Sequence, residues 1–298
     1  MFVSAPNCRN ERRPVAASLA MLLVAMISIQ AGAALAKSLF PLVGAAGAAA
    51  LRLAFASLML LIVWRPWRRL PSREAALPII VYGLAMGGMN LLFYSALRRI
   101  PLGIAVALEF TGPLAVATAS SRRGRDFLWI VLAALGLLLL LPVRRRAAVL
   151  DPAGIGYALG AGACWALYIV FGRRAGALHG GRTAALGMLV GSALIVPIGA
   201  ASAGAKLWSV SLWPVALGVA LLSSALPYSL EMFALTRLPT RTFGVLMSGE
   251  PAVAALSGLC FLGERLTLAQ WAAILCIVLA SGGSAATAAR RGASPRAD

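Results

Sequence analysis

Ten apolar stretches, each about long enough to cross a bilayer, constrain the fold of this chain more than any other feature. A spanning α-helix needs about 20 predominantly apolar residues. The stretches lie at 15–36, 43–63, 76–97, 102–120, 126–143, 153–171, 183–201, 212–235, 241–260 and 267–286. Because the connections between them are short, little chain is left for a domain outside the membrane. The sequence therefore predicts an all-α polytopic membrane protein with ten transmembrane helices.

The composition leads to the same class. Of 298 residues, 61% are apolar and 12% are charged, whereas soluble domains average roughly 45–50% and about 25%. The formal net charge of +18 would indicate nucleic-acid binding in a soluble chain. Here the basic residues lie between the apolar stretches, so we interpret them as topology signals. The expected partner is the lipid bilayer, and no nucleic acid is expected.

The basic residues divide unequally between the two sides of the membrane. With the N-terminus inside, the cytoplasmic segments hold 18 Lys and Arg residues and the opposite side holds 8. The positive-inside rule then predicts that both termini are cytoplasmic. Three arginines at 144–146 run against this assignment.

The first stretch resembles a signal peptide ending in Ala34-Leu35-Ala36, but we expect it to remain as the first helix, since its removal would break the repeat.

The chain contains an internal repeat. The segment ALRRIP at 96–101 is matched by ALTRLP at 234–239, and Pro113 is matched by Pro251 at the same offset of 138 residues. These matches indicate two five-helix halves, 15–143 and 153–286. Because five is odd, the second half enters the membrane from the opposite side. Inverted repeats of this kind are typical of secondary transporters.

Four ionisable residues fall within the predicted spans: Arg52, Glu109, Glu231 and Glu250. A charge at mid-bilayer costs about 2.5–3.5 kcal/mol on insertion scales, so it persists only when paired, hydrated or used. These residues are candidates for binding substrate or protons. The alternatives are a structural ion pair or a carboxyl group held protonated by helix packing, and Glu231 lies near enough to the boundary to reach interfacial water.

Two of these carboxylates stand beside helix-breaking residues. Glu109 precedes Pro113 by four residues, with Gly112 between them, and Glu250 follows Gly249 and immediately precedes Pro251. Proline removes a helix hydrogen bond and frees carbonyl groups, which allows a broken or kinked helix. Such a break beside a carboxylate can hold a cation or an ammonium group, although proline also serves packing alone in membrane helices.

Other polar and small residues in the spans can be interpreted either as lining a cavity or as packing helices together. Candidates for lining a cavity are Gln30, Asn90, Tyr94, Trp165, Tyr168 and Tyr228. The alternative for each is an interhelical hydrogen bond or an interface anchor. The glycine pairs 83/87, 156/160 and 187/191 predict close helix approach, and we infer no ligand from them.

Several enzymatic functions lack the residues that they would need. The run from Gly32 to Lys37-Ser38 lacks the fixed glycines of a P-loop and ends an apolar stretch instead of following a strand. The single histidine, His179, gives a membrane hydrolase no base within a span. The four cysteines have no metal or redox spacing. We therefore predict no catalytic residues, no metal and no cofactor.

The segment PLGIAVALEFTGP at 101–113, together with the ten stretches and two halves, resembles the EamA-type drug/metabolite transporter superfamily. More narrowly, several segments resemble the bacterial inner-membrane exporters of threonine and homoserine: IQ at 29–30, AKSLFPLVG at 36–44, GGMN at 87–90, GAGACWA at 160–166, LPYSLEM at 226–232 and LTRLPTRTFG at 235–244. The resemblance implies export of these amino acids, driven by the proton gradient, from the bacterial inner membrane.

An amino-acid substrate also suits the ionisable residues. A zwitterion needs a cation for its carboxylate and an anion for its ammonium group, and Arg52 with Glu109 or Glu250 supplies both. The substrate and the proton are thus the expected small-molecule partners. The alternatives are a broader drug or metabolite exporter of the same superfamily, or a membrane-embedded enzyme or scaffold. The oligomeric state and the full substrate range do not follow from the sequence.

Overall fold

The computed structural model describes residues 9–68, 70–119, 124–140, 150–179, 182–227, 230 and 247–292, which form helices joined by short turns. The first predicted half gives α1 (Arg9–Lys37), α2 (Phe40–Trp64), α3 (Arg73–Leu97), α4 (Leu102–Glu109), α5 (Thr111–Ala119) and α6 (Gly124–Leu140). The second gives α7 (Pro152–His179), α8 (Arg182–Ala203), α9 (Trp213–Ala220), α12 (Glu250–Leu262) and α13 (Leu268–Gly292). Short 3₁₀ turns are η1 (Pro66–Arg68), η2 (Gly204–Trp208) and η3 (Val210–Leu212), and a π-helical turn, η4 (Leu221–Ala225), continues α9.

Each predicted span corresponds to a helix or to a pair of helical segments. Within the described ranges, five helices are long and apolar enough to cross a membrane by length and composition: α1, α2, α3, α7 and α8. Shorter apolar helical stretches cover Leu102–Val116, Val210–Ala225, Glu250–Leu262 and Leu268–Gly283. The fourth span, expected over 102–120, has a turn at Phe110 that divides it into α4 and α5, which is the kind of interruption that Gly112 and Pro113 allow. The fold is therefore an all-α, ten-span membrane architecture.

Local sequence explains where these helices begin and end. Ser72 caps α3, since its Oγ accepts a hydrogen bond from the N–H of Ala75 at 3.3 Å. Proline stands in the first turn of α2, α9 and α12, where a helix needs no N–H donor. At the other end of α12, Gly263 adopts a left-handed conformation with φ of 65° and terminates the helix.

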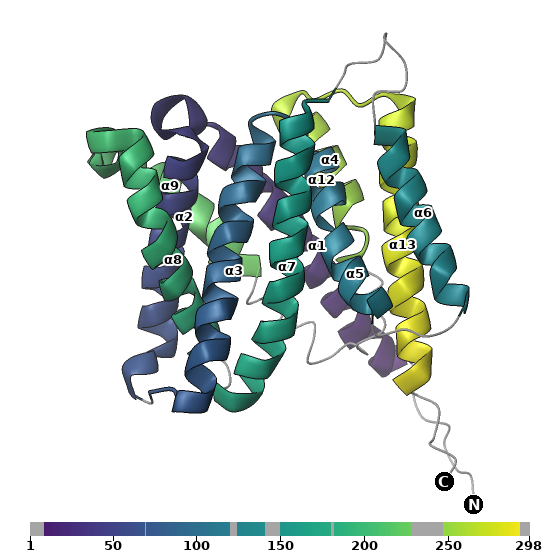
Figure 1. Cartoon of the computed structure of the whole chain (residues 1–298), viewed down its shortest axis with the longest axis horizontal. Coiled ribbons are helices and arrows are strands. Elements are labelled where there is room, and N and C mark those ends of the chain that lie inside the picture. The colour runs from purple at the N-terminus through teal and green to yellow at the C-terminus, as the bar shows by residue number, and fades with distance from the viewer. Residues whose placement is uncertain are drawn as a thin grey trace, which may run out of the picture.

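The helices pack in the pattern that an inverted repeat requires. Three helices contact their own counterparts from the other half: α2 packs on α8, α4 on α12 and α6 on α13. Other contacts come in exchanged pairs, since α3 packs on α7 while α1 packs on α9 and η4. In Figure 1, α2 and α8 form one edge of the bundle, α3 and α7 its middle, and α6 and α13 the other edge. The start of α1 and the end of α13 lie at the same end of the bundle, as an even number of spans demands.

Glycines allow α3 and α8 to cross closely. A Cβ added to Gly83 would lie 2.6 Å from the carbonyl oxygen of Gly187, and one added to Gly87 would lie 3.1 Å from Cα of Gly191. The close approach predicted for these two pairs is thus confirmed, between α3 and α8. In the third pair only Gly160 lies close to another helix, since a Cβ there would lie 3.2 Å from Cδ1 of Leu92 in α3, whereas one on Gly156 would meet no heavy atom within 4 Å.

The outer surface of the bundle carries many large apolar side chains. Leu58, Ile62, Leu77 and Leu275 are all more than half exposed. A soluble monomer rarely exposes such a continuous apolar surface. Lipid tails cover it in a membrane, which accounts for its extent.

Candidate functional site

Arg52 is held in α2 by two neutral oxygen atoms. One terminal nitrogen, Nη1, lies 3.4 Å from the hydroxyl of Tyr94 in α3, and the guanidinium stands 5.6 Å from the centre of that ring. The other, Nη2, donates to the carbonyl of Ser223 at 3.2 Å. Ser223 lies in the π-helical turn η4, where the wider backbone spacing disrupts the α-helical hydrogen-bond ladder. The local helix geometry therefore supplies an acceptor for the cation.

Glu250 is the first residue of α12 and is buried, with 6% of its surface exposed. The predicted break is present, since the chain turns at Ser248 and Gly249 before α12 begins, so Glu250 does not lie within a continuous helix. A carboxylate at a helix N-terminus interacts favourably with the helix dipole. Its Oε1 also accepts a hydrogen bond from Nε2 of Gln30 in α1, at 3.1 Å.

Glu109 stands at the matching break in the first half. It is the last residue of α4, and the chain turns at Phe110 before α5 begins. Pro113 has no N–H to donate to the carbonyl of Glu109, so the ladder is interrupted there. A Cβ on Gly112 would lie 1.9 Å from the carbonyl oxygen of Gly162, so α5 and α7 meet backbone to backbone. This crossing fixes the position of the break.

The three charges come together in the described structure. Glu109 is close enough to interact electrostatically with both Glu250 and Arg52. The three residues come from α4, α12 and α2, and the two carboxylates are almost fully buried. The resulting cluster offers a cation for a carboxylate ligand and two anions for an ammonium group or a proton.

The other predicted residues differ in their relation to this cluster. Tyr94 and Gln30 contact it directly, through Arg52 and Glu250. Trp165 packs edge-on against Phe110 at the α4–α5 break, with ring centres 4.8 Å apart. Asn90 donates to the carbonyl of Met86 one turn earlier in its own helix, at 2.9 Å.

Two further predictions concern aromatic packing and the undescribed residues. Tyr168 stacks on Tyr82 with ring centres 4.7 Å apart, an α3–α7 packing contact. Glu231 and Tyr228 lie outside the described residues. Within the described ranges no three His, Cys, Asp or Glu side chains gather closely enough to hold a metal ion.

Several buried polar atoms near the cluster have no hydrogen-bond partner among the described residues. They include Oε1 of Gln30 and the hydroxyls of Ser57, Ser223 and Ser224. An unsatisfied buried polar group costs about 1–3 kcal/mol, so such groups are rare unless a ligand or water completes them. Their concentration on α1, α2 and η4 indicates a polar region within the apolar bundle.

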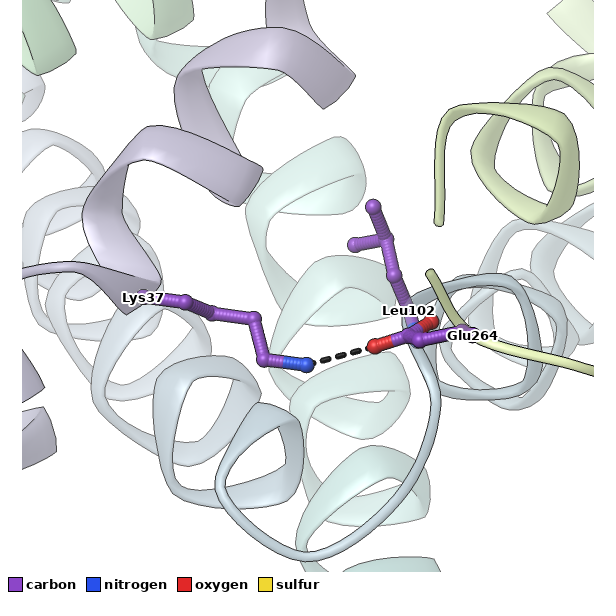
Figure 2. A network of polar contacts seen from close by, with 3 residues as sticks. All are labelled: Lys37, Leu102 and Glu264. Atoms are coloured by element: carbon purple, nitrogen blue, oxygen red, sulfur yellow. Dashed lines mark hydrogen bonds and ion pairs between the residues drawn. The ribbon is translucent and has the colours of Figure 1, made fainter. Parts of the chain in front are cut away.

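Sequence reasoning missed a second pair of charges, Lys37 and Glu264. Lys37 ends α1, and its Nζ lies 2.5 Å from Oε1 of Glu264 in the turn between α12 and α13 (Figure 2). The available signal was positional. Lys37 is the only charged residue between the first two predicted spans, and Glu264 is the only acidic residue between the last two. An inverted pair of five-helix halves brings these two connections to the same end.

Ten spans, inverted halves and breaks beside buried carboxylates are the architecture of a multi-pass membrane transporter. Residues 152–284 match the model of the EamA-like transporter family. The chain is 59% identical over 276 residues to the threonine/homoserine exporter RhtA of Escherichia coli (strain K12), covering 93% of this chain and 94% of that protein. The protein of the same name from Salmonella typhimurium (strain LT2) is 59% identical over 277 residues, with the same coverage. The chain therefore belongs to the EamA-like transporter family, and it is a transporter of the bacterial inner membrane and not an enzyme.

More distant matches agree with this fold. An uncharacterized transporter of Bacillus subtilis (strain 168), YwfM, is 29% identical over 241 residues, which is 75% of this chain and 78% of that protein. A solved crystal structure superposes with a TM-score of 0.59 at 20% identity, covering 93% of this chain and 99% of the other. At that identity the likeness concerns the fold alone.

Proposed function

We propose that this protein exports threonine, homoserine and related small amino acids by proton antiport, with both termini in the cytoplasm. The observation that carries the proposal is 59% identity to named threonine/homoserine exporters across 93% of the chain. The arrangement of Arg52, Glu109 and Glu250 supports it independently, because it matches the two charges of an amino acid.

In the proposed mechanism Arg52 binds the substrate carboxylate. Its guanidinium is held by neutral oxygens of Tyr94 and Ser223, so no described ion pair competes for its charge. Either Glu109 or Glu250 binds the ammonium group. Two buried carboxylates near one another repel unless a proton or a cation lies between them. The same carboxylate therefore binds the ammonium group and the proton in turn, and this competition couples the two fluxes.

The two halves of the sequence, 15–143 and 153–286, are proposed to be the functional repeats of this mechanism. Each half contributes one carboxylate at a helix break, Glu109 in the first and Glu250 in the second. Glu231 remains a further candidate for binding protons or substrate.

The decisive test uses purified protein in proteoliposomes loaded with labelled threonine or homoserine. An imposed pH gradient should drive efflux without ATP, and an uncoupler should abolish it. If the protein moves drugs or other metabolites but neither amino acid, the broader exporter of the same family is the correct function. If it moves none of these, the transport proposal is wrong.

A further inference from the structure

The Lys37–Glu264 contact is the less exposed of the two ion pairs found among the described residues. The side chains are 23% and 13% exposed, against 45% and 35% for Arg99 and Asp151, the other pair. An exposed ion pair contributes little to the stability of a protein, whereas the attraction within a partly buried pair is screened less by water and salt. Lys37 also lies in the last turn of α1, where a cation interacts favourably with the helix dipole.

Glu264 makes a second contact that ties a third helix to the pair. Its Oε2 accepts a hydrogen bond from the backbone N–H of Leu102 at 2.8 Å, and Leu102 is the first residue of α4 (Figure 2). The first N–H groups of a helix have no partner within the helix. One carboxylate therefore joins the end of α1, the start of α4 and the α12–α13 turn.

The local sequence is built to place this carboxylate. The left-handed Gly263 turns the chain back over α12, so the N–H of Glu264 bonds the carbonyl of Gly258 at 3.1 Å. A Cβ on Gly258 would lie 2.5 Å from Oε2 of Glu264, so a larger residue there would displace the carboxylate. Two glycines thus determine where the Glu264 side chain lies.

The Lys37–Glu264 contact lies a short distance along the helix axes from the cluster of Arg52, Glu109 and Glu250. Lys37 follows Gln30 by seven residues in α1, and Leu102 precedes Glu109 by seven residues in α4. At 1.5 Å per residue, both distances along the helix axes are about 10 Å. Gln30, Glu109 and Glu250 lie in α1, α4 and α12. The Lys37–Glu264 contact therefore connects the same three helices that carry these residues.

The contact also joins the two halves of the chain at one end of the bundle. Lys37 and Leu102 belong to the first half, and Glu264 belongs to the second. This end lies opposite the start of α1 and the end of α13. Alternating access requires that a central site be closed at one end while it is open at the other.

From these contacts we propose that Lys37 and Glu264 form a gate, which closes the path from the charge cluster at this end and must separate for substrate to leave there. The proposal rests on the proposed transport function. Glu264 and Lys37 are positioning residues that hold α1 and α4 together. They do not bind substrate.

Two variants remove the ion pair and keep the helix contact. Lys37→Met leaves Glu264 in place, and Glu264→Gln retains an oxygen that accepts from Leu102. Each should increase the fraction of molecules that are open at the end where Lys37 and Glu264 lie. In a background where Cys164 is the only cysteine, this thiol should then react faster with an impermeant reagent added on that side of the membrane. Cys164 suits this use because it adjoins Trp165 in α7, whose ring packs on Phe110 at the α4–α5 break beside Glu109. We expect an increase of about threefold to tenfold, with the double variant no faster than either single one. Asp151→Asn is the matched control, since it removes the exposed ion pair at the same end and should leave the rate of Cys164 labelling unchanged.

A reversible cross-link tests the gate directly. Lys37→Cys and Glu264→Cys in a background without other cysteines are joined by a short bifunctional methanethiosulfonate. Labelled threonine efflux should fall to the level of protein-free liposomes and return when a reductant cleaves the link. Lys37→Cys alone, treated identically, should keep transporting.

The outcomes separate the two proposals. If the untreated double-cysteine protein moves threonine and the cross-linked protein moves it equally fast, the gate is wrong and the transport function stands. Unchanged Cys164 reactivity in both Lys37→Met and Glu264→Gln would also overturn the gate. If the parental protein transports no amino acid, the proposed function itself fails.

Discussion

Nε2 of Gln30 and Oε1 of Glu250 lie 3.1 Å apart, and this buried hydrogen bond joins α1 to α12 across 220 positions of sequence. It connects the two helices whose later residues, Lys37 and Gly258, contact Glu264 at one end of the bundle. The bond gives Glu250 a neutral donor. Unlike a cation, this donor does not neutralise the carboxylate.

Neutralising either buried carboxylate should leave the fold intact and impair coupling. Gln at position 250 can still accept a hydrogen bond from Gln30, so Glu250→Gln should accumulate normally in the membrane, as should Glu109→Gln. At least one should lose efflux driven by a pH gradient, measured in proteoliposomes. Glu74→Gln, at an exposed position in the first turn of α3, serves as the control. Parental rates in both buried variants would contradict the proposed site.

Arg52→Ala should weaken substrate binding by roughly 10-fold to 100-fold, because a hydrogen bond to a charged group is worth about 1.5–3 kcal/mol. Arg52→Lys should restore binding only in part, since Nη1 and Nη2 serve two different partners and a lysine cannot reproduce that fork. Equilibrium binding of labelled threonine in detergent measures both. If Arg52→Ala fails to accumulate and a second change at Glu109 or Glu250 restores it, Arg52 is a structural ion-pair partner instead.

Gly112→Ala should destabilise the protein by about 1–3 kcal/mol or more, because the new Cβ would lie 1.9 Å from a backbone oxygen of Gly162. Gly156→Ala is the matched substitution, in a helix and with no heavy atom within 4 Å of the new Cβ. Thermal unfolding in detergent should show a lower midpoint for the first variant alone. Equal midpoints would mean that α5 and α7 do not cross so closely.

The orientation predicted from the basic residues can be tested with reporters and thiol labelling. A reporter fused after Asp298 that functions only in the cytoplasm should be active. A cysteine introduced in the 144–150 connection should react with an impermeant thiol reagent from outside, whereas one replacing the exposed Trp67, in a connection predicted to be cytoplasmic, should not. The reverse pattern would overturn the orientation and leave the fold unchanged.

The exposed Arg99–Asp151 pair should make stability depend weakly on pH. The hydrogen bond from Arg99 lowers the pKa of Asp151 from its ordinary value of 3.8. A lowered folded-state pKa means that the stabilisation is present above about pH 4 and is lost as the pH falls through the lowered value. Asp151→Asn should therefore lower the unfolding midpoint at neutral pH, and the difference from the parent should shrink near about pH 3. A difference that persists undiminished in acid would exclude this origin.

Much of the fold was predictable because a membrane leaves few alternatives. Backbone groups in lipid must bond within a helix, so apolar length alone located the spans. The breaks beside Glu109 and Glu250 were also foreseeable, since Pro113 and Pro251 remove donors that a continuous helix needs. The π-helical turn at 221–225 carries no such marker, because Leu, Ser and Ala are all compatible with an α-helix.

The individual contacts within the site could not be predicted for a related reason. Polar side chains in a span all resemble candidate ligands in the sequence, and only packing separates Asn90, which bonds its own helix, from Tyr94, which meets Arg52. The partner of Lys37 required knowing that two connections more than 220 residues apart lie at the same end. That knowledge comes from three-dimensional packing, which single-sequence periodicity does not contain.

The contact between Gly112 and Gly162 limits how the bundle can move. Two backbones packed without intervening side chains have nothing that can change rotamer to let them slide, so α5 and α7 are expected to travel together. The glycine crossing of α3 and α8 has the same consequence. Both crossings join a helix of the first half to a helix of the second. If the proposed transport involves rocking of rigid bodies, each body is therefore expected to combine segments from both halves, so that the boundary between moving parts does not follow the boundary between the repeats.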